Sequence, residues 1–321
     1  MMSNAVKQFP QQFTFVPKVQ NASHLKPFDQ AFYIGMGGSH LAADLALLCH
    51  PKLPLSISSD YGLSAPIECV SRPLVIAGSY SGNTEETLDG YETARKHKLP
   101  VAVIASGGKL IDLAKKHHAP YIEIPNTGIQ PRMALGFALR ALLKLLGDER
   151  GLRDSARLVK TLKPLMYRKT GEHLAGRLRG KIPVIYSSTR NQAIAYNWKI
   201  KFNETGKIPA FFNVIPELNH NEMNGFDVTA ATKKLCAPFH FIFLTDAQDH
   251  PRVQKRFAIL ERLYTKRGLP VERQPIVGKE PFEKVFRSLL TADWTAITIA
   301  DAYGLESELV PMVEEFKGLM V

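Results

Sequence analysis

Short apolar runs alternate with amphipathic segments through the first half of the chain. The apolar runs that predict strands are 32–34, 55–59, 74–77, 101–105 and 121–124. The segments with helical spacing are 38–50, 85–96, 110–117 and 133–146. Strands that are buried on both faces read as continuous apolar runs, so this alternation predicts a parallel sheet covered by helices.

The alternation stops at residues 147–151 (GDERG), whose turn and charged residues predict a domain boundary. A long basic stretch to residue 179, expected to be helical, follows. The alternation then resumes with strands predicted at 184–187, 211–215, 239–244 and 271–276, and helices at 192–204, 253–266, 286–303 and from 311 onward. We therefore predict an α/β protein of two αβα domains, 1–150 and 151–321, each with a mainly parallel five-stranded sheet. Residues 1–27 show little periodicity and are expected to be loosely ordered or to wrap on a partner.

The most informative polar stretch follows the third predicted strand. Residues 79–84 (SYSGNT) place three hydroxyls and a glycine where that strand gives way to a helix. Unpaired N–H groups and the positive end of the dipole lie at a helix N-terminus, so hydroxyls gathered there make a phosphate site. An ordinary N-cap by Thr84 or Ser81 explains one hydroxyl but not three. We expect Ser79, Ser81 and Thr84 to bind a phosphate.

A glycine-rich loop follows the first predicted strand. Residues 35–39 (GMGGS) include Gly38 and end at Ser39, and glycines there let backbone N–H groups approach a ligand. The dinucleotide fingerprint requires a glycine where this chain has His40, although Asp60 after the second strand keeps that interpretation open. Tight packing of strand on helix is the structural alternative. Since both loops lie at the carboxyl edge of a parallel sheet, together they favour one phosphosugar.

Three charged side chains stand at the ends of other predicted elements. Arg132 precedes a helix, where a guanidinium suits a phosphate or a developing oxyanion. Glu204 ends a helix just before Gly206, and a carboxylate at the negative end of the dipole is a better proton acceptor, which suits a general base. His220 lies in the run ELNHNE and can exchange protons near neutral pH. Each also has a plain explanation: an exposed arginine, a solvent-facing glutamate, a structural histidine.

Composition and motifs limit the class of protein. With 45% hydrophobic and 22% charged residues, the chain is typical of a globular protein with a full core. No apolar run approaches the about 20 residues of a membrane helix, and no signal peptide is visible. Cys49, Cys69 and Cys236 are sparse and odd in number, which favours a reducing cytoplasm over a disulfide framework. The cysteines are isolated and no H-E-x-x-H motif occurs, so we predict no metal site.

Most of the net charge of +11 lies in one segment. Residues 151–207 hold thirteen Lys/Arg and three Asp/Glu, a net of +10. A solvated helical face and a surface that steers an anionic metabolite explain this charge equally well. No nucleic-acid-binding motif accompanies it, so neither nucleic acid nor a membrane is expected as a partner.

Taken together, these stretches resemble a known family. The runs 35–39 (GMGGS), 79–84 (SYSGNT), 131–132 (PR), 203–204 (NE) and 217–222 (ELNHNE) occur in the order and spacing of the bifunctional phosphoglucose/phosphomannose isomerases of the sugar-isomerase (SIS) superfamily. The similarity runs from about residue 32 to the terminal helix. The serine–threonine loop is shared by the whole superfamily and indicates only a phosphosugar, whereas the other elements together are more specific. His40 departs from the family, where a small residue is more usual.

The resemblance implies two SIS-type domains and a metal-independent isomerase without a cofactor. The reaction would interconvert glucose 6-phosphate, and also mannose 6-phosphate, with fructose 6-phosphate through a cis-enediol(ate) intermediate. The positions that match the phosphate-binding residues of the family are Gly38, Ser39, Ser79, Ser81 and Thr84.

The resemblance also implies a role for each matching catalytic position. Glu204 would move a proton between C2 and C1 of the open-chain sugar, and Arg132 would stabilise the charge of the intermediate. His220 would assist ring opening, reaching across from the partner subunit of a homodimer that shares its active sites. Lys317, four residues from the end as in the family, would help at the ring oxygen.

Two other functions remain open from the sequence. A phosphosugar sensor of the same superfamily would keep the hydroxyl loop but would have no use for Glu204, Arg132 and His220 together. An amide-transferring or epimerising sugar-phosphate enzyme is the second. The amide-transferring kind would carry an ammonia-supplying domain or an N-terminal catalytic cysteine, and residue 2 is Met2.

Overall fold

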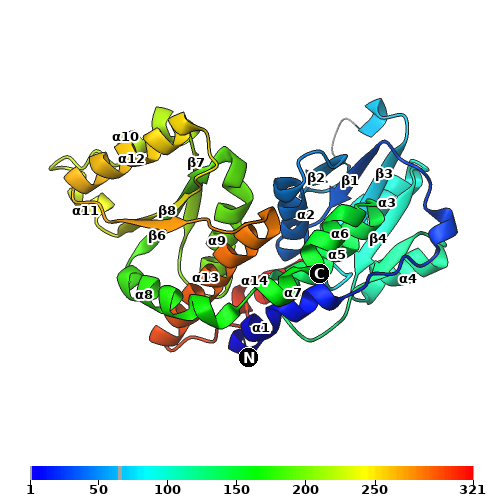
Figure 1. Ribbon diagram of the computed structural model, residues 1–321. Helices are drawn as coiled ribbons and strands as arrows, with labels where there is room; N and C mark the ends of the chain where they lie inside the picture. Colours follow the sequence, from blue (N-terminus) through cyan, green and yellow to red (C-terminus); the bar gives the residue numbers. More distant parts are fainter. Residues whose placement is uncertain (1, 64–66, 321) are drawn as a thin grey trace. The chain divides into compact units, whose positions relative to one another are not determined.

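The computed structural model describes residues 2–63 and 67–320, and its contacts divide the chain into two compact units (Figure 1). The N-terminal unit comprises residues 8–161. The C-terminal unit comprises residues 162–321 together with residues 1–7. Each unit is an α/β structure built on one parallel sheet, as the alternation of apolar runs predicts.

Five parallel strands form the sheet of the N-terminal unit, in the order β2-β1-β3-β4-β5. The strands are β1 (Gln30–Ile34), β2 (Leu55–Ser58), β3 (Pro73–Ser79), β4 (Val101–Ala105) and β5 (Tyr121–Glu123). The main helices are α2 (Gly38–Cys49), α3 (Glu85–Lys96), α4 (Gly108–Lys116) and α5 (Leu135–Leu145). The order reverses between β1 and β3, so the loops after these two strands flank a topological switch point, where open α/β sheets bind ligands.

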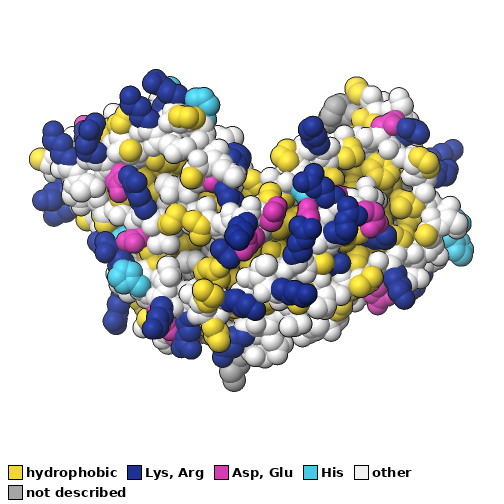
Figure 2. Space-filling view, viewed as in Figure 1, with side chains coloured by type: hydrophobic (Ala, Val, Ile, Leu, Met, Phe, Trp, Pro, Cys, Tyr) yellow, Lys and Arg dark blue, Asp and Glu magenta, His cyan; other side chains and the backbone are white. Residues whose placement is uncertain are grey.

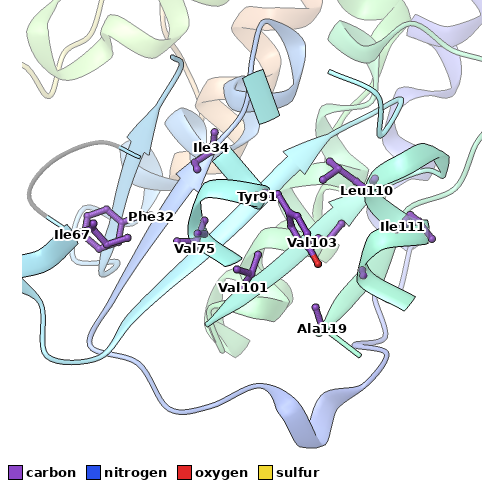
Figure 3. Packing of buried hydrophobic residues seen from close by; sticks show 14 residues of the cluster. Phe32, Ile34, Ile67, Val75, Tyr91, Val101, Val103, Leu110, Ile111 and Ala119 are labelled. Carbon is purple, nitrogen blue, oxygen red and sulfur yellow. The ribbon is translucent and has the colours of Figure 1, made fainter. Parts of the chain in front are cut away.

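The core of this unit explains why its strands are apolar without interruption. Figure 3 shows Val75 and Val103 of the sheet packed against Tyr91 of α3 and Leu110 of α4. All four side chains are fully buried. Burial of apolar surface is favourable by roughly 25 cal/mol per Å2, so the buried central strands stabilise the sheet. The loops at the edge of the sheet do not have to supply this stability and are available to bind a ligand.

The first residues of the chain are helical, which corrects the expectation of loose order. They form α1 (Met2–Gln8) and the 3-10 helix η1 (Phe9–Thr14). Their buried apolar residues, at helical spacing, are Met2, Val6, Phe9 and Phe13. The buried Gln12 Nε2 donates to Met133 O at 2.6 Å, and Gly136 N donates to Gln12 Oε1 at 2.9 Å. The polar Gln12 hides this segment in the sequence, yet its amide satisfies the backbone at the start of α5.

The basic stretch after α5 is helical, as expected, but it is divided into several short helices. These are α6 (Glu149–Ala156), α7 (Leu158–Thr161), η5 (Pro164–Tyr167) and α8 (Arg168–Leu178). Pro164 lacks an N–H donor and starts a new element, so the helix cannot run through it. Helices α6 and α7 belong to the N-terminal unit, although the predicted boundary assigns them to the second domain. The reason is that Arg140 of α5 donates to Leu152 O and Ser155 Oγ of α6, both at 2.9 Å.

Four parallel strands, one fewer than predicted, form the sheet of the C-terminal unit in the order β7-β6-β8-β9. They are β6 (Ile182–Ser188), β7 (Phe211–Ile215), β8 (Phe239–Thr245) and β9 (Val271–Pro275). The long helices are α9 (Gln192–Glu204), α12 (Pro251–Lys266), α13 (Pro281–Ala302) and the terminal α14 (Pro311–Leu319). After β9 only residues 276–280 precede the 22-residue α13, and no fifth strand joins this sheet among the described residues of the unit.

Short elements complete the two units. In the N-terminal unit these are η2 (Ala22–His24), η3 (Ile67–Cys69) and η4 (Pro131–Met133). In the C-terminal unit they are η6 (Thr189–Asn191), η7 (Glu217–His220), α10 (Glu222–Gly225) and α11 (Lys233–Cys236). All three cysteines are free. Within the described ranges no helix has the length and apolarity needed to cross a membrane.

A buried histidine makes the stability of the C-terminal unit sensitive to acid. Burial, with Arg177 and Lys181 nearby, lowers the pKa of His240 on β8 from 6.5 to about 4. The unfolded chain therefore binds a proton first as the pH falls, so this contribution to stability is complete above about pH 6.5 and is lost towards pH 4. We expect His240→Leu to flatten the pH dependence of the free energy of unfolding over that range. Urea titrations followed by tryptophan fluorescence would check this, and parallel curves for the two proteins would contradict it.

Candidate functional site

Three hydroxyls gather at the carboxyl end of β3. Ser79 is the last residue of that strand, and its Oγ lies 2.7 Å from Thr84 Oγ1 and 3.5 Å from Ser81 Oγ. Thr84 occupies the N-cap position of α3, but its side chain makes no capping hydrogen bond. The hydroxyl instead meets Ser79, so the ordinary N-cap does not account for it. The cluster lies beside the N-terminus of α3, where N–H groups and the dipole favour an anion.

Gly82 gives this loop its shape. Its φ is +72°, and a Cβ at this position would lie 1.8 Å from Gly107 O. The loop is fastened to the start of α4, because Leu110 N donates to Gly82 O and Lys109 N donates to Asn83 Oδ1, both at 3.0 Å. Only glycine combines this left-handed backbone with so close an approach.

We expect Gly82→Ala to destabilise the protein and to weaken phosphosugar binding together. A left-handed alanine costs about 1–2 kcal/mol, and displacing the backbone of Gly107 costs about 1–3 kcal/mol more. Gly147→Ala is the matched control, since Gly147 has φ +70° and no atom within 4 Å of its Cβ position. Calorimetric unfolding and titration with fructose 6-phosphate would measure both effects. Equal losses in the two variants would show that the approach to Gly107 is unimportant.

The structure joins the glycine loop to the hydroxyl cluster and brings the backbone of Arg132 against the glycine loop. Tyr80 N donates to Ser39 Oγ at 3.0 Å, which joins the loop after β1 to the loop after β3. A Cβ on Gly38 would lie 2.8 Å from Arg132 N, so this glycine lets η4 lie directly against the first turn of α2. The Arg132 side chain is 1% exposed, and its Nη1 lies 3.5 Å from Gln130 Oε1. The five predicted phosphate residues thus lie in the two loops at one switch point, and the backbone of Arg132 lies against one of these loops.

The side chain of His40 pairs with a residue of its own helix. Its Nδ1 lies 2.7 Å from Asp44 Oδ2, one turn later, and the residue is buried. The large side chain in the glycine loop is therefore accommodated by an i,i+4 pair within α2.

Sequence reasoning missed a tyrosine that supports the glycine loop. Tyr33 Oη donates to Ser39 O at 2.8 Å. A Cβ on Gly78 would lie 1.9 Å from Tyr33 Oη, so this hydroxyl fills the space that Gly78 leaves. Burial raises the pKa of Tyr33 far above its usual range, which keeps the phenol protonated as a donor. The only signal in the sequence was a glycine inside an apolar strand.

Glu204 is the last residue of α9 and is half-buried. Lys207 Nζ donates to the backbone oxygen of Glu204 at 2.5 Å and also to Leu309 O. The left-handed residue after this helix is Lys207, with φ +58°, and not Gly206. Gly206 is needed for close packing instead, since its Cβ would lie 2.8 Å from Phe202 O. The end of α9 is therefore held from both sides.

Hydrogen bonds of the ELNHNE motif stabilise the segment that carries His220. The Glu222 carboxylate accepts hydrogen bonds from Tyr186 Oη and Asn213 Nδ2. Asn221 Nδ2 donates to Glu217 Oε1 at 2.8 Å. His220 itself is exposed at the end of η7. The polar residues around it hold the turn, and the imidazole is left to solvent or a ligand.

Glu204 and His220 lie at opposite edges of the C-terminal sheet. Helix α9 returns from the carboxyl end of β6 to the start of β7, so Glu204 is at the amino edge. His220 follows the far end of β7. Five strand residues at about 3.3 Å each separate the two edges by roughly 16 Å. Within one chain these two side chains are therefore not brought together.

Lys317 lies on the exposed terminal helix α14. Its Nζ is 2.8 Å from Glu314 Oε1, and both side chains are nearly two-thirds exposed. This i,i+3 pair in the last turn matches the simple favourable interaction of a lysine with the helix dipole.

The switch point of the C-terminal sheet, between β6 and β8, carries carboxylates where the N-terminal sheet has hydroxyls. Asp246 and Asp249 are 2% and 5% exposed. Lys284 and Arg190 pair with Asp246, and Ser188 Oγ donates to Asp249 Oδ1 at 2.8 Å. Burial raises the pKa of Asp249. A phosphate is expected to bind better in the N-terminal unit, because the cations at the switch point of the C-terminal sheet are already neutralised by the protein's own acids.

No three His, Cys, Asp or Glu side chains are grouped as metal ligands in the part of the chain that the structure describes.

Comparisons with known proteins agree with this architecture. A family model described as the bacterial phospho-glucose isomerase C-terminal SIS domain matches residues 168–320. The bifunctional phosphoglucose/phosphomannose isomerase of Aquifex aeolicus is 34% identical over 306 residues, which cover 92% of each chain. The D-glucosamine-6-phosphate 4-epimerase of Sulfolobus acidocaldarius is 32% identical over 203 residues, 62% of this chain and 64% of that protein. The crystal structure of tagatose-6-phosphate ketose/aldose isomerase from Escherichia coli matches with a TM-score of 0.68 at 14% identity, over 95% of this chain and 94% of that one. That likeness confirms the predicted fold class.

Proposed function

This chain belongs to the family of bifunctional phosphoglucose/phosphomannose isomerases, and we propose that it interconverts fructose 6-phosphate with glucose 6-phosphate and mannose 6-phosphate without a metal ion. The observation that carries the proposal is the 34% identity with a relative of that name over 92% of both chains. The hydroxyl cluster of residues 79–84, joined to Ser39, supports a phosphosugar as the substrate.

The sugar phosphate binds at the switch point of the N-terminal sheet. Ser79, Ser81, Thr84 and Ser39 donate hydroxyl hydrogen bonds to the phosphate oxygens, and the first turn of α3 adds backbone N–H groups. Gly38 keeps the start of α2 clear of a side chain. No cation beyond the protein's own is needed to hold the dianion, because charge-assisted hydrogen bonds of this kind are strong.

Isomerisation requires one base that serves two adjacent carbons. Glu204 removes the proton from C2 of the open-chain aldose and returns it to C1. In the cis-enediol(ate) intermediate the C1=O double bond has become C1=C2, and it ends as C2=O while the hydroxyl proton passes from O2 to O1. The Arg132 guanidinium stabilises the negative charge that develops on the enediolate oxygen. Acceptance of both C2 epimers requires that rotation about C2–C3 present either C2 proton to the same carboxylate.

Ring opening precedes the proton transfer and needs a second acid or base. His220 is the proposed group, and it acts in trans, since within one subunit it lies at the opposite sheet edge from Glu204. A homodimer in which each site receives His220 of the partner subunit follows from this assignment. Lys317 assists at the ring oxygen.

A coupled assay on the EDTA-treated protein tests the proposal. Fructose 6-phosphate is supplied, and glucose 6-phosphate and mannose 6-phosphate are detected separately. Formation of both products is expected. Glucose 6-phosphate alone would narrow the specificity, activity only after metal is restored would overturn metal independence, and tight binding without turnover would favour a phosphosugar sensor.

A second candidate is suggested by the epimerase relative, which is 32% identical over 62% of this chain. Its name denotes the inversion of C4 in an amino sugar 6-phosphate. The same assay series with D-glucosamine 6-phosphate decides between the two, since conversion of that substrate in preference to fructose 6-phosphate would favour the epimerase.

A further inference from the structure

A pocket lined by none of the proposed catalytic or phosphate-binding residues lies within the C-terminal unit, between α12 and the η7–α10 segment. Its cavity volume of about 320 Å3 is that of a small-molecule site. Six of its lining residues come from α12, at positions 252, 255, 256, 259, 260 and 263. This spacing places them on one face of the helix. Asn219 and Met223 form the opposite wall.

One end of the pocket is strongly positive. Arg252, Lys255 and Arg256 line it, and no acidic residue does. None of the three has an ion pair with another residue in the described ranges, whereas Arg267 at the far end of α12 pairs with Asp227. The three cations occupy the first turns of α12, where the helix dipole adds positive potential. Like charges one turn apart repel one another, so this end of the pocket is suited to an anion.

The other end of the pocket is apolar. Ile259, Leu260 and Leu263 follow the cations along the same face, and Met223 faces them from α10. Ile259 is 37% exposed. Arg256 links the two walls, because its Nη1 donates to Asn219 Oδ1 at 3.3 Å. Figure 2 shows Lys and Arg side chains gathered over the region of α10 and α12, with apolar side chains among them.

We propose that this pocket binds a small organic anion with an apolar body, such as the carboxylate or phosphate monoester of an alkyl or aryl group. The anion contacts Arg252, Lys255 and Arg256, and the apolar body lies on Ile259 and Leu263. A sugar phosphate is a poorer occupant, because its polar hydroxyls would face leucine and isoleucine without partners. A nucleic acid is also poorer, since its phosphates need a basic track and not an apolar end wall.

The fluorescent probe 8-anilinonaphthalene-1-sulfonate, which combines a sulfonate with aromatic rings, tests the proposal on the full-length protein. Saturable binding is expected, and Arg252→Ser with Lys255→Ser should weaken it about tenfold or more. Arg262→Ser is the matched control, because Arg262 is an exposed arginine of α12 that does not line the pocket. Leu263→Ser should also weaken binding of the probe. Near-ultraviolet circular dichroism verifies that each variant is folded.

Competition distinguishes the chemistry of the occupant. Octyl phosphate should displace the probe at far lower concentration than inorganic phosphate, and fructose 6-phosphate should not displace it. Equal displacement by octyl and inorganic phosphate would overturn the role of the apolar wall. Displacement of the probe by fructose 6-phosphate would overturn the proposal. Displacement by duplex DNA that is stronger than displacement by octyl phosphate, or loss of probe binding when the protein self-associates, would do so too. Unchanged binding in the double variant would do the same.

Discussion

Glu204→Gln is expected to lower kcat by about 10²–10⁴-fold, the usual contribution of a positioned general base. Glutamine has nearly the same shape as glutamate, and the hydrogen bond from Lys207 is accepted by the backbone oxygen of residue 204, so the end of α9 keeps it. The amide cannot accept the C2 proton, and no other group in the proposed mechanism takes over that role. Phosphosugar binding should survive, because the hydroxyl cluster belongs to the other unit of the chain.

Steady-state rates with fructose 6-phosphate and titration calorimetry on the same preparation measure the two effects separately. Glu92→Gln is the matched control, since Glu92 is an exposed carboxylate of α3 and the chemical change is identical. It should leave both kcat and affinity unchanged. Retained turnover in Glu204→Gln would refute the assignment of the base. Loss of both phosphosugar binding and turnover would instead indicate a structural role for Glu204.

Asp293→Ala is expected to lower the free energy of unfolding of the C-terminal unit by about 3–5 kcal/mol. Asp293 on α13 accepts a hydrogen bond from Lys201 Nζ at 2.5 Å, and the two side chains are only 4% and 3% exposed. Removing the carboxylate leaves the Lys201 ammonium buried without its counter-ion. Lys201 precedes Glu204 by three residues on α9, so this pair also anchors the helix that ends in the proposed base.

Urea unfolding followed by tryptophan fluorescence measures this loss, because both tryptophans of the chain, Trp198 and Trp294, lie in the C-terminal unit. Glu172→Ala is the control, since it removes an exposed i,i+4 pair with Arg168 and should cost only about 0.3–0.5 kcal/mol. The double variant Lys201→Met, Asp293→Leu should recover most of the stability, because neither charge is then buried. A double variant as unstable as Asp293→Ala would show that the buried charge is not the cause.

Local patterns in the sequence were enough to predict the α/β class, most strands and the edge where the hydroxyls lie. The predicted helix 85–96 and strand 211–215 coincide with α3 and β7. These elements are readable because burial on both faces imposes a continuous apolar run, and parallel strands bring their carboxyl ends to one edge. Thr84, the last residue of the 79–84 loop, lies at the N-terminus of the helix as the sequence indicates, although its partner Ser79 was not evident from the sequence.

Pairings between residues far apart in the sequence were decided only by the tertiary structure. Gly82 must be glycine because Gly107 passes against it, and Lys201 is buried because Asp293, 92 positions later, meets it. Periodicity reports which face of an element is buried, but the partner on that face is chosen by packing of the whole unit, and that choice has no local signature in the chain.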